Sequence, residues 1–209
     1  MSKFYDWKNG IKEEELTDVV NTLNNDGIVV FPTETVYGIA GSSLSEVAID
    51  KIYKAKNRPR EKAINIMLAD KKDINKYAVV KSKVEQNIID TYMPGPITLI
   101  LEKKEDFGKG FTLSDNTIGI RIPDNEIAQA ILKRLEYPII APSANISGKE
   151  SGVDAIEIKE DFYNTVDIII DGGRIKDAGA STLVKVESER VVVLRAGKIK
   201  FQNWGRDSL

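Results

Sequence analysis

Segments with helical periodicity alternate with short apolar runs along most of the chain, and this alternation constrains the fold more than any other feature. Apolar residues within 16–23 recur at the three- and four-residue spacing of one helical face, and the turn-forming run 25–27 predicts the end of that helix. A second helix is expected from a cap at Ser43 to near Pro59, and a third after a cap at Asp124.

Strands are expected between these helices and become frequent toward the end of the sequence. The apolar or alternating runs that predict them are 28–31, 63–69, 96–101, 117–123, 138–141, 166–170, 181–186 and 190–194. This order predicts an α/β fold, a twisted open mixed sheet with helices on its faces. A length of 209 residues favours one domain, residues 1–209.

The composition excludes several kinds of chemistry. With 42% hydrophobic and 30% charged residues the chain has the profile of a soluble globular protein. It contains no cysteine and no histidine, which rules out zinc-thiolate sites, Ser-His-Asp triads and imidazole acid-base catalysis. Neither a signal peptide nor a run of ~20 apolar residues is evident, so we expect a cytoplasmic protein without a membrane span. Thirty basic and 32 acidic residues give a net charge of −2, so any anion site must be local.

Three polar clusters follow predicted strands or helices, at residues 32–38, 56–62 and 141–148. Ligands of open α/β sheets gather at strand ends, so we expect the three clusters to converge. Each also has a simpler interpretation. Lys56, Arg58, Arg60 and Lys62 suit either a solvated helix end or a phosphate clamp.

The other two clusters are equally open to two interpretations. Ser143 and Asn145 suit either a capped turn or phosphate contacts, and Glu34 suits local turn chemistry. Tyr37 more often packs than reacts. In 117–123 the isoleucines alternate with polar residues, so Arg121 is expected to face away from the isoleucine layer.

The ordered set of motifs is more specific than any one of them. In sequence they are PTETVYG, KNRP, MPGPITLIL, TIGIRIP, APSANISG, IIDGG, ST and RAG. This set, over about residues 12–197, resembles the YrdC-like family, the threonylcarbamoyl-AMP synthases. The resemblance implies a YrdC-like fold and an enzyme that makes threonylcarbamoyl-AMP and pyrophosphate from L-threonine, bicarbonate and ATP, with Mg²⁺ bridging the phosphates. The product would pass to a tRNA threonylcarbamoyl transferase.

The resemblance also implies site residues. Those that would grip the ATP phosphates and act as the catalytic set are Lys56, Arg58, Ser143 and Asn145. Further ATP contacts would come from Lys62, Thr117, Ser151 and Arg195. The threonine side of the pocket would comprise Thr33, Thr35, Met67, Arg121, Ala141 and Ser181, with Arg121 pairing with the substrate carboxylate. The polar stretch 33–38 would then be the pocket wall, with its glycine leaving room for the guest.

The sequence departs from the family pattern in two places. Residues 62–66 replace the usual Asn-Pro-Leu, and Met67 stands where a histidine is common. Ser151-Gly152-Val153 replaces a Ser-Pro-Thr. A chain of this length also leaves no room for the C-terminal domain of longer relatives, so pocket closure would need another route or a partner.

Two alternatives remain beside the synthase. The first is a double-stranded RNA or tRNA binding module, in which the basic run contacts phosphates. The second is a family paralogue with the same fold and no synthase activity.

Overall fold

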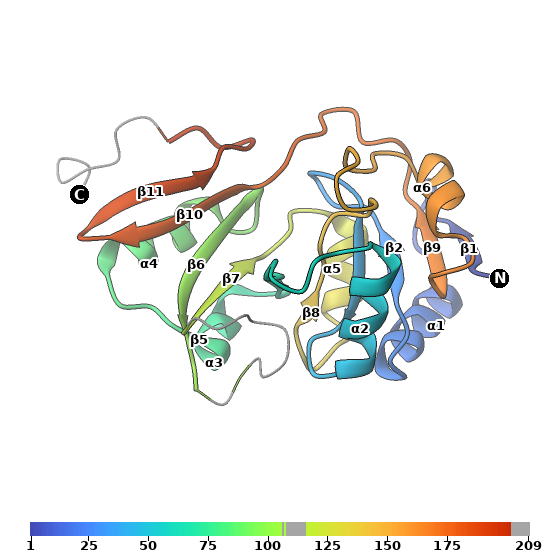
Figure 1. Cartoon of the computed structure of the whole chain (residues 1–209), viewed down its shortest axis with the longest axis horizontal. Coiled ribbons are helices and arrows are strands. Elements are labelled where there is room, and N and C mark those ends of the chain that lie inside the picture. Colours follow the sequence, from blue (N-terminus) through green and yellow to red (C-terminus); the bar gives the residue numbers. More distant parts are fainter. Residues whose placement is uncertain (106, 108–115, 202–209) are drawn as a thin grey trace.

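The computed structural model describes residues 1–105, 107 and 116–201, which form one continuous mixed sheet flanked by helices (Figure 1). The helices are α1 (Glu13–Asn24), α2 (Glu46–Ala55), α3 (Ile74–Tyr77), α4 (Lys83–Tyr92), α5 (Glu126–Leu132) and α6 (Ala155–Phe162), with a 3-10 turn at Lys71–Asp73. The strands are β1 (Lys3–Asp6), β2 (Val29–Phe31), β3 (Gly38–Ser42), β4 (Ile66–Met67), β5 (Ala78–Val79), β6 (Ile97–Lys103), β7 (Thr117–Arg121), β8 (Ile139–Ile140), β9 (Ile168–Asp171), β10 (Thr182–Glu187) and β11 (Arg190–Arg195).

The sheet mixes parallel and antiparallel pairs. Its order is β1-β9-β2-β3-β8-β4-β7-β6-β10-β11, and β5 pairs with β6 beside this path. The pairs β1–β9, β9–β2, β4–β7 and β6–β10 are parallel, whereas the others are antiparallel. The two-residue strands β4 and β8 join the half of the sheet that contains β1, β2, β3 and β9 to the half that contains β6, β7, β10 and β11.

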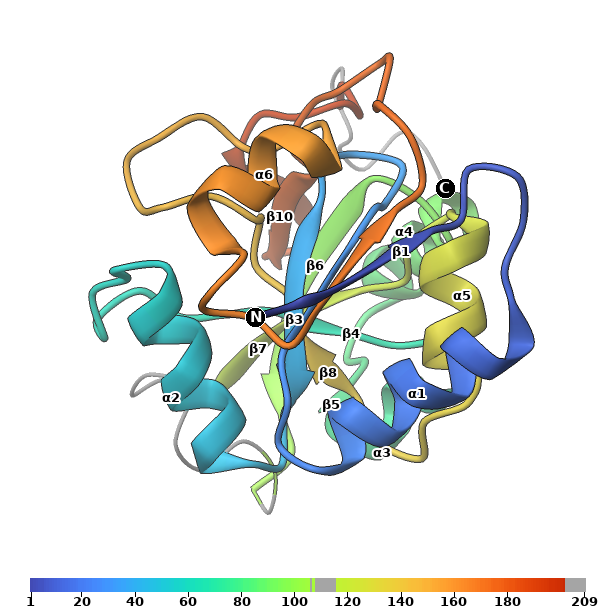
Figure 2. The ribbon, with the colours of Figure 1, turned by 90° about the vertical axis from the view of Figure 1, so that its right-hand side faces the viewer.

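Helices cover both faces of the sheet because its strands are apolar on both sides. In β9, Ile168 and Ile170 pack in one buried cluster with α1 and α5, whereas Ile169 packs in another with α2 and α6. Successive side chains of a strand point to opposite faces, so each central strand serves two cores. Figure 2 shows α2 and α6 on one side of the strands and α1 and α5 on the other. The predicted α/β class, with an open mixed sheet and helices on its faces, is confirmed.

Two predicted helix caps were wrong by one or two positions. The Ser45 side chain, not Ser43, accepts from the Ala48 backbone N–H at 3.0 Å, and Ser43 instead donates its hydroxyl to the Pro138 carbonyl at 2.6 Å. Asn125 rather than Asp124 caps α5. Neighbouring polar residues compete for the cap, and the backbone path selects the one in extended conformation beside the first turn.

Some elements were longer, shorter or absent in the sequence-based prediction. The run 63–69 yields only the two-residue β4, and the carbonyls of Lys62 and Ala63 before it accept hydrogen bonds from Arg58. The strands β1, β3 and β5 and the helices α3, α4 and α6 were not predicted. Strand β1 is short and pairs with β9 across the whole chain, and β3 is a run of small residues without alternation. Among the described residues, no helix has both the length and the apolar character needed to cross a bilayer.

Candidate functional site

A cavity of about 140 Å³ lies where the three polar clusters meet the two halves of the sheet. Its lining on one side comes from Thr35 and Val36 and from the segment 141–143, and on the other from Ser181 and Arg195. Arg58 and the segment 63–67 complete it from the loop after α2, and Arg121 completes it from the end of β7. Hydroxyl groups and guanidinium groups therefore dominate its polar surface.

Backbone hydrogen bonds hold the three clusters together, as the sequence predicted. The Ala144 N–H donates to the Tyr37 carbonyl at 2.7 Å, and Gly38 forms a bridge with Ser143. The Ser147 N–H donates to the Lys56 carbonyl at 2.8 Å. The convergence is confirmed, because all three segments share one set of backbone contacts.

Lys56 is the helix C-cap of α2, and its side chain is almost completely buried, with 1% exposed. The ammonium donates to the backbone carbonyls of Ser143 and Asn145 and to the Asn145 side-chain oxygen, the last at 3.3 Å. Burial, and secondarily the nearby Arg58 guanidinium, lowers the pKa of Lys56 to about 8. Lys56 therefore acts here as a support beneath the 143–145 loop.

The polar side-chain atoms of Asn145 form hydrogen bonds within the same loop. Its side-chain oxygen accepts from the Ser143 hydroxyl at 2.6 Å, and its amide nitrogen donates to the carbonyls of Ile146 and Lys149 at 3.0 and 2.9 Å. Ser143 lines the cavity, whereas Asn145 and Lys56 lie behind it. Of the residues expected at the phosphates, Arg58 and Ser143 thus face the cavity and the other two position Ser143.

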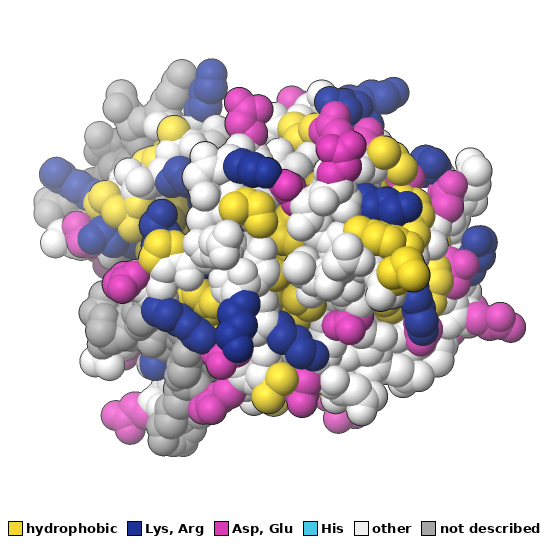
Figure 3. Space-filling model, turned by 45° about the vertical axis from the view of Figure 1, so that its right-hand side comes forward, with side chains coloured by type: hydrophobic (Ala, Val, Ile, Leu, Met, Phe, Trp, Pro, Cys, Tyr) yellow, Lys and Arg dark blue, Asp and Glu magenta, His cyan; other side chains and the backbone are white. Residues whose placement is uncertain are grey.

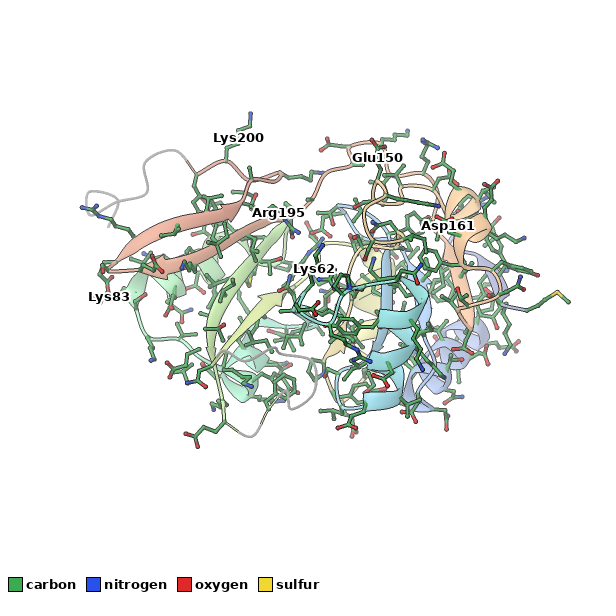
Figure 4. The ribbon with its side chains drawn as sticks, in the orientation of Figure 1. Lys62, Lys83, Glu150, Asp161, Arg195 and Lys200 are labelled. Atoms are coloured by element: carbon green, nitrogen blue, oxygen red, sulfur yellow. The ribbon has the colours of Figure 1, made fainter. Side chains whose placement is uncertain are left out.

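The basic run after α2 divides into separate roles. Arg58 lines the cavity and donates to the carbonyls of Lys62 and Ala63 at 3.2 and 2.7 Å. Arg60 forms an exposed ion pair with Asp50 and stacks over the Tyr53 ring at 4.5 Å. Lys62 is exposed and lies outside the cavity lining, in the loop that follows α2 (Figure 4). The helix-end interpretation therefore describes Arg60, and the ligand interpretation fits Arg58.

Arg121 lines the cavity at the end of β7, beside Thr35. Its Nη2 donates to the Thr35 hydroxyl at 2.7 Å and to the Thr33 hydroxyl at 3.3 Å, and it lies 2.9 Å from a carboxylate oxygen of Glu34. Thr33 is buried, and its hydroxyl also donates to the Val36 carbonyl at 2.7 Å. The stretch after β2 is polar because it wraps this guanidinium.

Ser181, directly before β10, and Arg195, the last residue of β11, form another wall of the cavity. The Ser181 hydroxyl lies 2.9 Å from that of Thr98, and Arg195 Nη2 donates to the Ser181 hydroxyl and carbonyl at 3.0 Å each. Burial, and secondarily the charge of Arg121, lowers the pKa of Arg195. An anion bound beside Arg195 would therefore stabilise the charged form of this guanidinium.

The remaining predicted site residues are divided between the cavity and its surroundings. Met67, Ala141 and Ser151 line the cavity. Thr117 is exposed at the start of β7, about 13 Å of strand away from Arg121, and lies outside the lining. Gly38 lies outside the cavity lining, and a Cβ there would meet the Pro142 carbonyl oxygen at 3.6 Å and the Ala141 Cβ at 3.8 Å, which are ordinary contacts. That this glycine leaves room for a ligand stays a prediction.

Two polar side chains of the site were not predicted from the sequence. Asn65 and Thr98 line the cavity, and each is a polar residue inside an apolar run, which is the signal that was available. Gly119 makes room for Asn65, because a Cβ at this position would lie 2.0 Å from the Asn65 side-chain oxygen. Tyr37, in contrast, packs as expected. It is buried, its hydroxyl donates to the Gly173 carbonyl at 2.7 Å, and burial raises its pKa.

This arrangement suits an anionic ligand with several oxygen atoms. Arg58, Arg121 and Arg195 bring three guanidiniums to one small cavity, and the hydroxyls between them offer further hydrogen bonds. Among the described residues, no group of three or more Asp, Glu, His or Cys side chains is arranged to hold a metal ion.

Comparison with known proteins identifies the family. Residues 21–197 match the Sua5/YciO/YrdC family model, which carries the description "Telomere recombination". The chain belongs to the Sua5/YciO/YrdC family. Its relatives in this family include a putative threonylcarbamoyl-AMP synthase of Methanocaldococcus jannaschii, 38% identical over 201 residues that cover 94% of each chain. The threonylcarbamoyl-AMP synthase of Pyrococcus abyssi is 34% identical over 192 residues, which cover 92% of this chain and 56% of that one.

Solved structures of the Sua5/YciO/YrdC family share the fold described above. Pyrococcus abyssi Sua5 complexed with L-threonine superposes with a TM-score of 0.89 at 34% identity, covering 94% of this chain and 58% of that chain. Escherichia coli YciO superposes with a TM-score of 0.86 at 26% identity, covering 94% and 96% of the two chains. The chain thus spans little more than half of the Pyrococcus protein and nearly all of YciO.

Proposed function

We propose that this protein is a threonylcarbamoyl-AMP synthase, which uses L-threonine, bicarbonate and ATP. The observation that carries the proposal is the cavity in which Arg58 and Ser143 face Arg121 and Ser181. Such a cavity offers one cationic wall to a triphosphate and another to a carboxylate. Curated relatives that carry this activity as their name support the proposal.

The ATP side would be formed by Arg58, Ser143, Ser151 and Arg195, with the support of Lys56 and Asn145. Lys62 and Thr117 lie at the periphery, and a nucleotide would reach them only where it extends beyond the cavity. Mg²⁺ would enter with the triphosphate as part of the substrate, since small hard cations usually keep waters and phosphate oxygens as ligands.

The amino-acid side would be formed by Arg121, Thr33, Thr35, Met67, Ala141 and Ser181. The guanidinium of Arg121, already oriented by two hydroxyls, would take the threonine carboxylate. Met67 stands where a histidine is common in the family, and it offers apolar contact to the threonine methyl group.

The reaction needs positioning and charge neutralisation rather than a protein nucleophile. Threonine nitrogen and bicarbonate combine to a carbamate with loss of water. A carbamate oxygen then attacks the α-phosphorus of ATP, and pyrophosphate leaves. Guanidiniums at the phosphates would stabilise charge that moves onto the leaving group, which is how phosphoryl and nucleotidyl transfer is commonly accelerated. A chain without cysteine and histidine is adequate for this chemistry.

The product would be passed to a tRNA threonylcarbamoyl transferase, and we propose that the chain acts as a single domain. We also propose a cytoplasmic location, the compartment expected from the sequence. Direct RNA contact is less well supported. Lys56 is buried and Arg60 is paired with Asp50, and Figure 3 shows basic and acidic side chains interspersed over one face of the molecule.

The test is to incubate the protein with ATP, Mg²⁺, L-threonine and labelled bicarbonate, and to look for a labelled adenylate and pyrophosphate. Arg58→Ala and Ser143→Ala should each lower product formation at least tenfold, whereas Arg60→Ala, a neighbouring arginine engaged by Asp50, should not. Absence of a labelled adenylate from the wild-type protein would refute the proposal. In that case, salt-sensitive RNA binding would favour the RNA-binding module. Absence of RNA binding would favour the family paralogue without synthase activity.

A further inference from the structure

Asn57, the second residue after α2, has a left-handed backbone conformation. Its φ is +48°, in a region that L-residues with a bulky or branched side chain rarely adopt. The Asn57 N–H donates to the Lys54 carbonyl at 3.1 Å, and the Arg58 N–H donates to the Tyr53 carbonyl at 2.9 Å. These two hydrogen bonds around a left-handed residue form a Schellman motif. Asn57 therefore sets the direction in which the chain leaves α2.

The residues on either side of Asn57 have different surroundings. Lys56, with 1% of its surface exposed, donates to the carbonyls of Ser143 and Asn145 beneath the 143–145 loop. Arg58 lines the cavity, where its Nε donates to the Lys62 carbonyl at 3.2 Å. The Tyr53 hydroxyl donates to the same carbonyl at 2.8 Å. The turn at Asn57 thus brings Arg58 back beside α2 and against the loop that follows it.

A helical φ at position 57 would change this path. The chain would continue along the axis of α2, rising 1.5 Å per residue, and the Arg58 N–H would no longer be directed at the Tyr53 carbonyl. Arg58 would then move away from the carbonyls of Lys62 and Ala63, which accept its side-chain hydrogen bonds. The position of Arg58 at the cavity therefore depends on the left-handed residue before it.

The side chain of Asn57 has no direct part in the site. It is exposed and lies outside the cavity lining, in a separate surface pocket that Lys51 and Lys54 also line. Its amide forms no hydrogen bond with any residue that the structure describes. Asparagine is one of the few residues other than glycine that adopt the left-handed conformation readily. What Asn57 contributes is therefore its backbone conformation.

We propose that Asn57 is a positioning residue for the reaction, because its left-handed conformation directs Lys56 beneath the 143–145 loop and Arg58 to the cavity. The inference rests on the proposed function insofar as these two cations form the ATP side of the site. The conformational part of it can be tested without any nucleotide.

The first test measures the affinity for ATP with Mg²⁺ by isothermal titration calorimetry, at a temperature at which every variant is folded. Asn57→Gly keeps the left-handed conformation accessible, so its affinity should stay within about twofold of the wild type. Asn57→Val disfavours that conformation, because valine is branched at Cβ, and should weaken ATP binding about 5- to 30-fold. Asn57→Ala should give a smaller loss in the same direction, and it provides the test if Asn57→Val does not fold.

Asp26→Val is the matched control. Asp26 occupies the corresponding position after α1, with a φ of +60°, and the Gly27 N–H donates to the Thr22 carbonyl at 2.8 Å. Asp26 lies outside the cavity lining. Asp26→Val and Asn57→Val should therefore lower the Tm by similar amounts, about 2–8 °C, because both force a branched residue into the left-handed region. Only Asn57→Val should weaken ATP binding.

The second test follows the Arg58 Nε–H signal by NMR in the absence of nucleotide, with Arg58→Ala to assign it. The hydrogen bond to the Lys62 carbonyl should protect this proton from exchange with water in the wild type, in Asn57→Gly and in Asp26→Val. In Asn57→Val its exchange should be about 5- to 30-fold faster, since the bonded position of Arg58 is less populated.

An unchanged Arg58 signal in Asn57→Val would overturn the inference, whatever happens to ATP binding. Equal weakening of ATP binding by Asp26→Val would overturn it as well, because the effect would then be one of general destabilisation. If the wild type binds no ATP, the proposed function fails and the Arg58 signal alone decides. Faster exchange in Asn57→Val, with protection kept in Asn57→Gly and Asp26→Val, upholds the role of Asn57.

Discussion

Lys56 makes the folding stability of this protein depend on pH in a way that one substitution should remove. The ammonium is buried beneath the 143–145 loop, and its pKa is lowered from 10.5 to about 8, mainly by burial. Lys56→Met keeps the aliphatic stem and removes the titrating group. The difference in free energy of unfolding between the two proteins should therefore change between pH 7 and pH 10.

The sign and size follow from proton linkage. Below pH 8 the lysine is charged in both folded and unfolded chains, and the folded state bears the full cost of burying the charge. Above pH 8 the folded chain releases its proton while the unfolded chain retains it up to about pH 10.5, so stability rises with pH. At 1.36 kcal/mol per pKa unit the whole effect is about 3 kcal/mol, of which about 2 kcal/mol falls between pH 7 and pH 10.

The assay is urea unfolding of the wild type and Lys56→Met at unit intervals from pH 7 to pH 10. Other groups titrate in both proteins, so the difference isolates Lys56. The wild type should gain about 2 kcal/mol relative to the variant over this range. Lys54→Met alters an exposed lysine in the last turn of α2. Its free energy of unfolding should change with pH as that of the wild type does. A constant difference between wild type and Lys56→Met would show that the three oxygens around the ammonium fully replace its hydration.

Three further predictions concern other parts of the molecule. Gly119→Ala should destabilise the protein by about 1–3 kcal/mol in urea unfolding, because its Cβ would collide with Asn65, and adding Asn65→Ala should recover most of the loss. Ser82→Ala removes the capping box of α4 and should cost about 1 kcal/mol in the same assay, with pyrophosphate release unchanged; a neutral result would mean that the cap is satisfied by solvent. Chelation of Mg²⁺ should abolish pyrophosphate release and leave threonine affinity unaltered by NMR titration, and a loss of threonine affinity would place the metal on the amino-acid side.

Helices and strands with strong local patterns were predictable from the sequence, and those defined by distant partners were not. The apolar stripe 16–23 marks α1, and its apolar positions Leu16, Val19 and Leu23 are buried. The alternation in 117–123 marks β7, although the strand is buried on both faces from Ile118 onward. Strand β1 exists only because it pairs with β9 more than 160 residues away, and no local signal marks it. Helix α4 is a different case, because its Ser82 and Glu85 capping box was legible in the sequence and was overlooked.

For the site, the sequence indicated which segments meet and could not indicate which atoms face the guest. Lys56 and Arg58 are two positions apart in one basic run, yet the end of α2 turns the first inward and leaves the second at the cavity. The spacing of the two residues in the sequence does not indicate these two directions. Nor does it reveal that the Glu34 oxygens, although ion-paired with Arg121, lack aligned hydrogen bonds, since satisfaction of a buried polar atom depends on every neighbour at once.

The hydrogen bonds that tie Lys56, Ser143 and Asn145 together have a consequence for the energetics of association. The loop is rigidified by its own chain, so a nucleotide that docks against Ser143 does not have to restrict its motion. Ordering a loop on binding carries an entropic penalty, and preorganisation removes it. A substitution at Asn145, which lies outside the cavity lining and holds the Ser143 hydroxyl, should therefore weaken nucleotide binding chiefly through entropy.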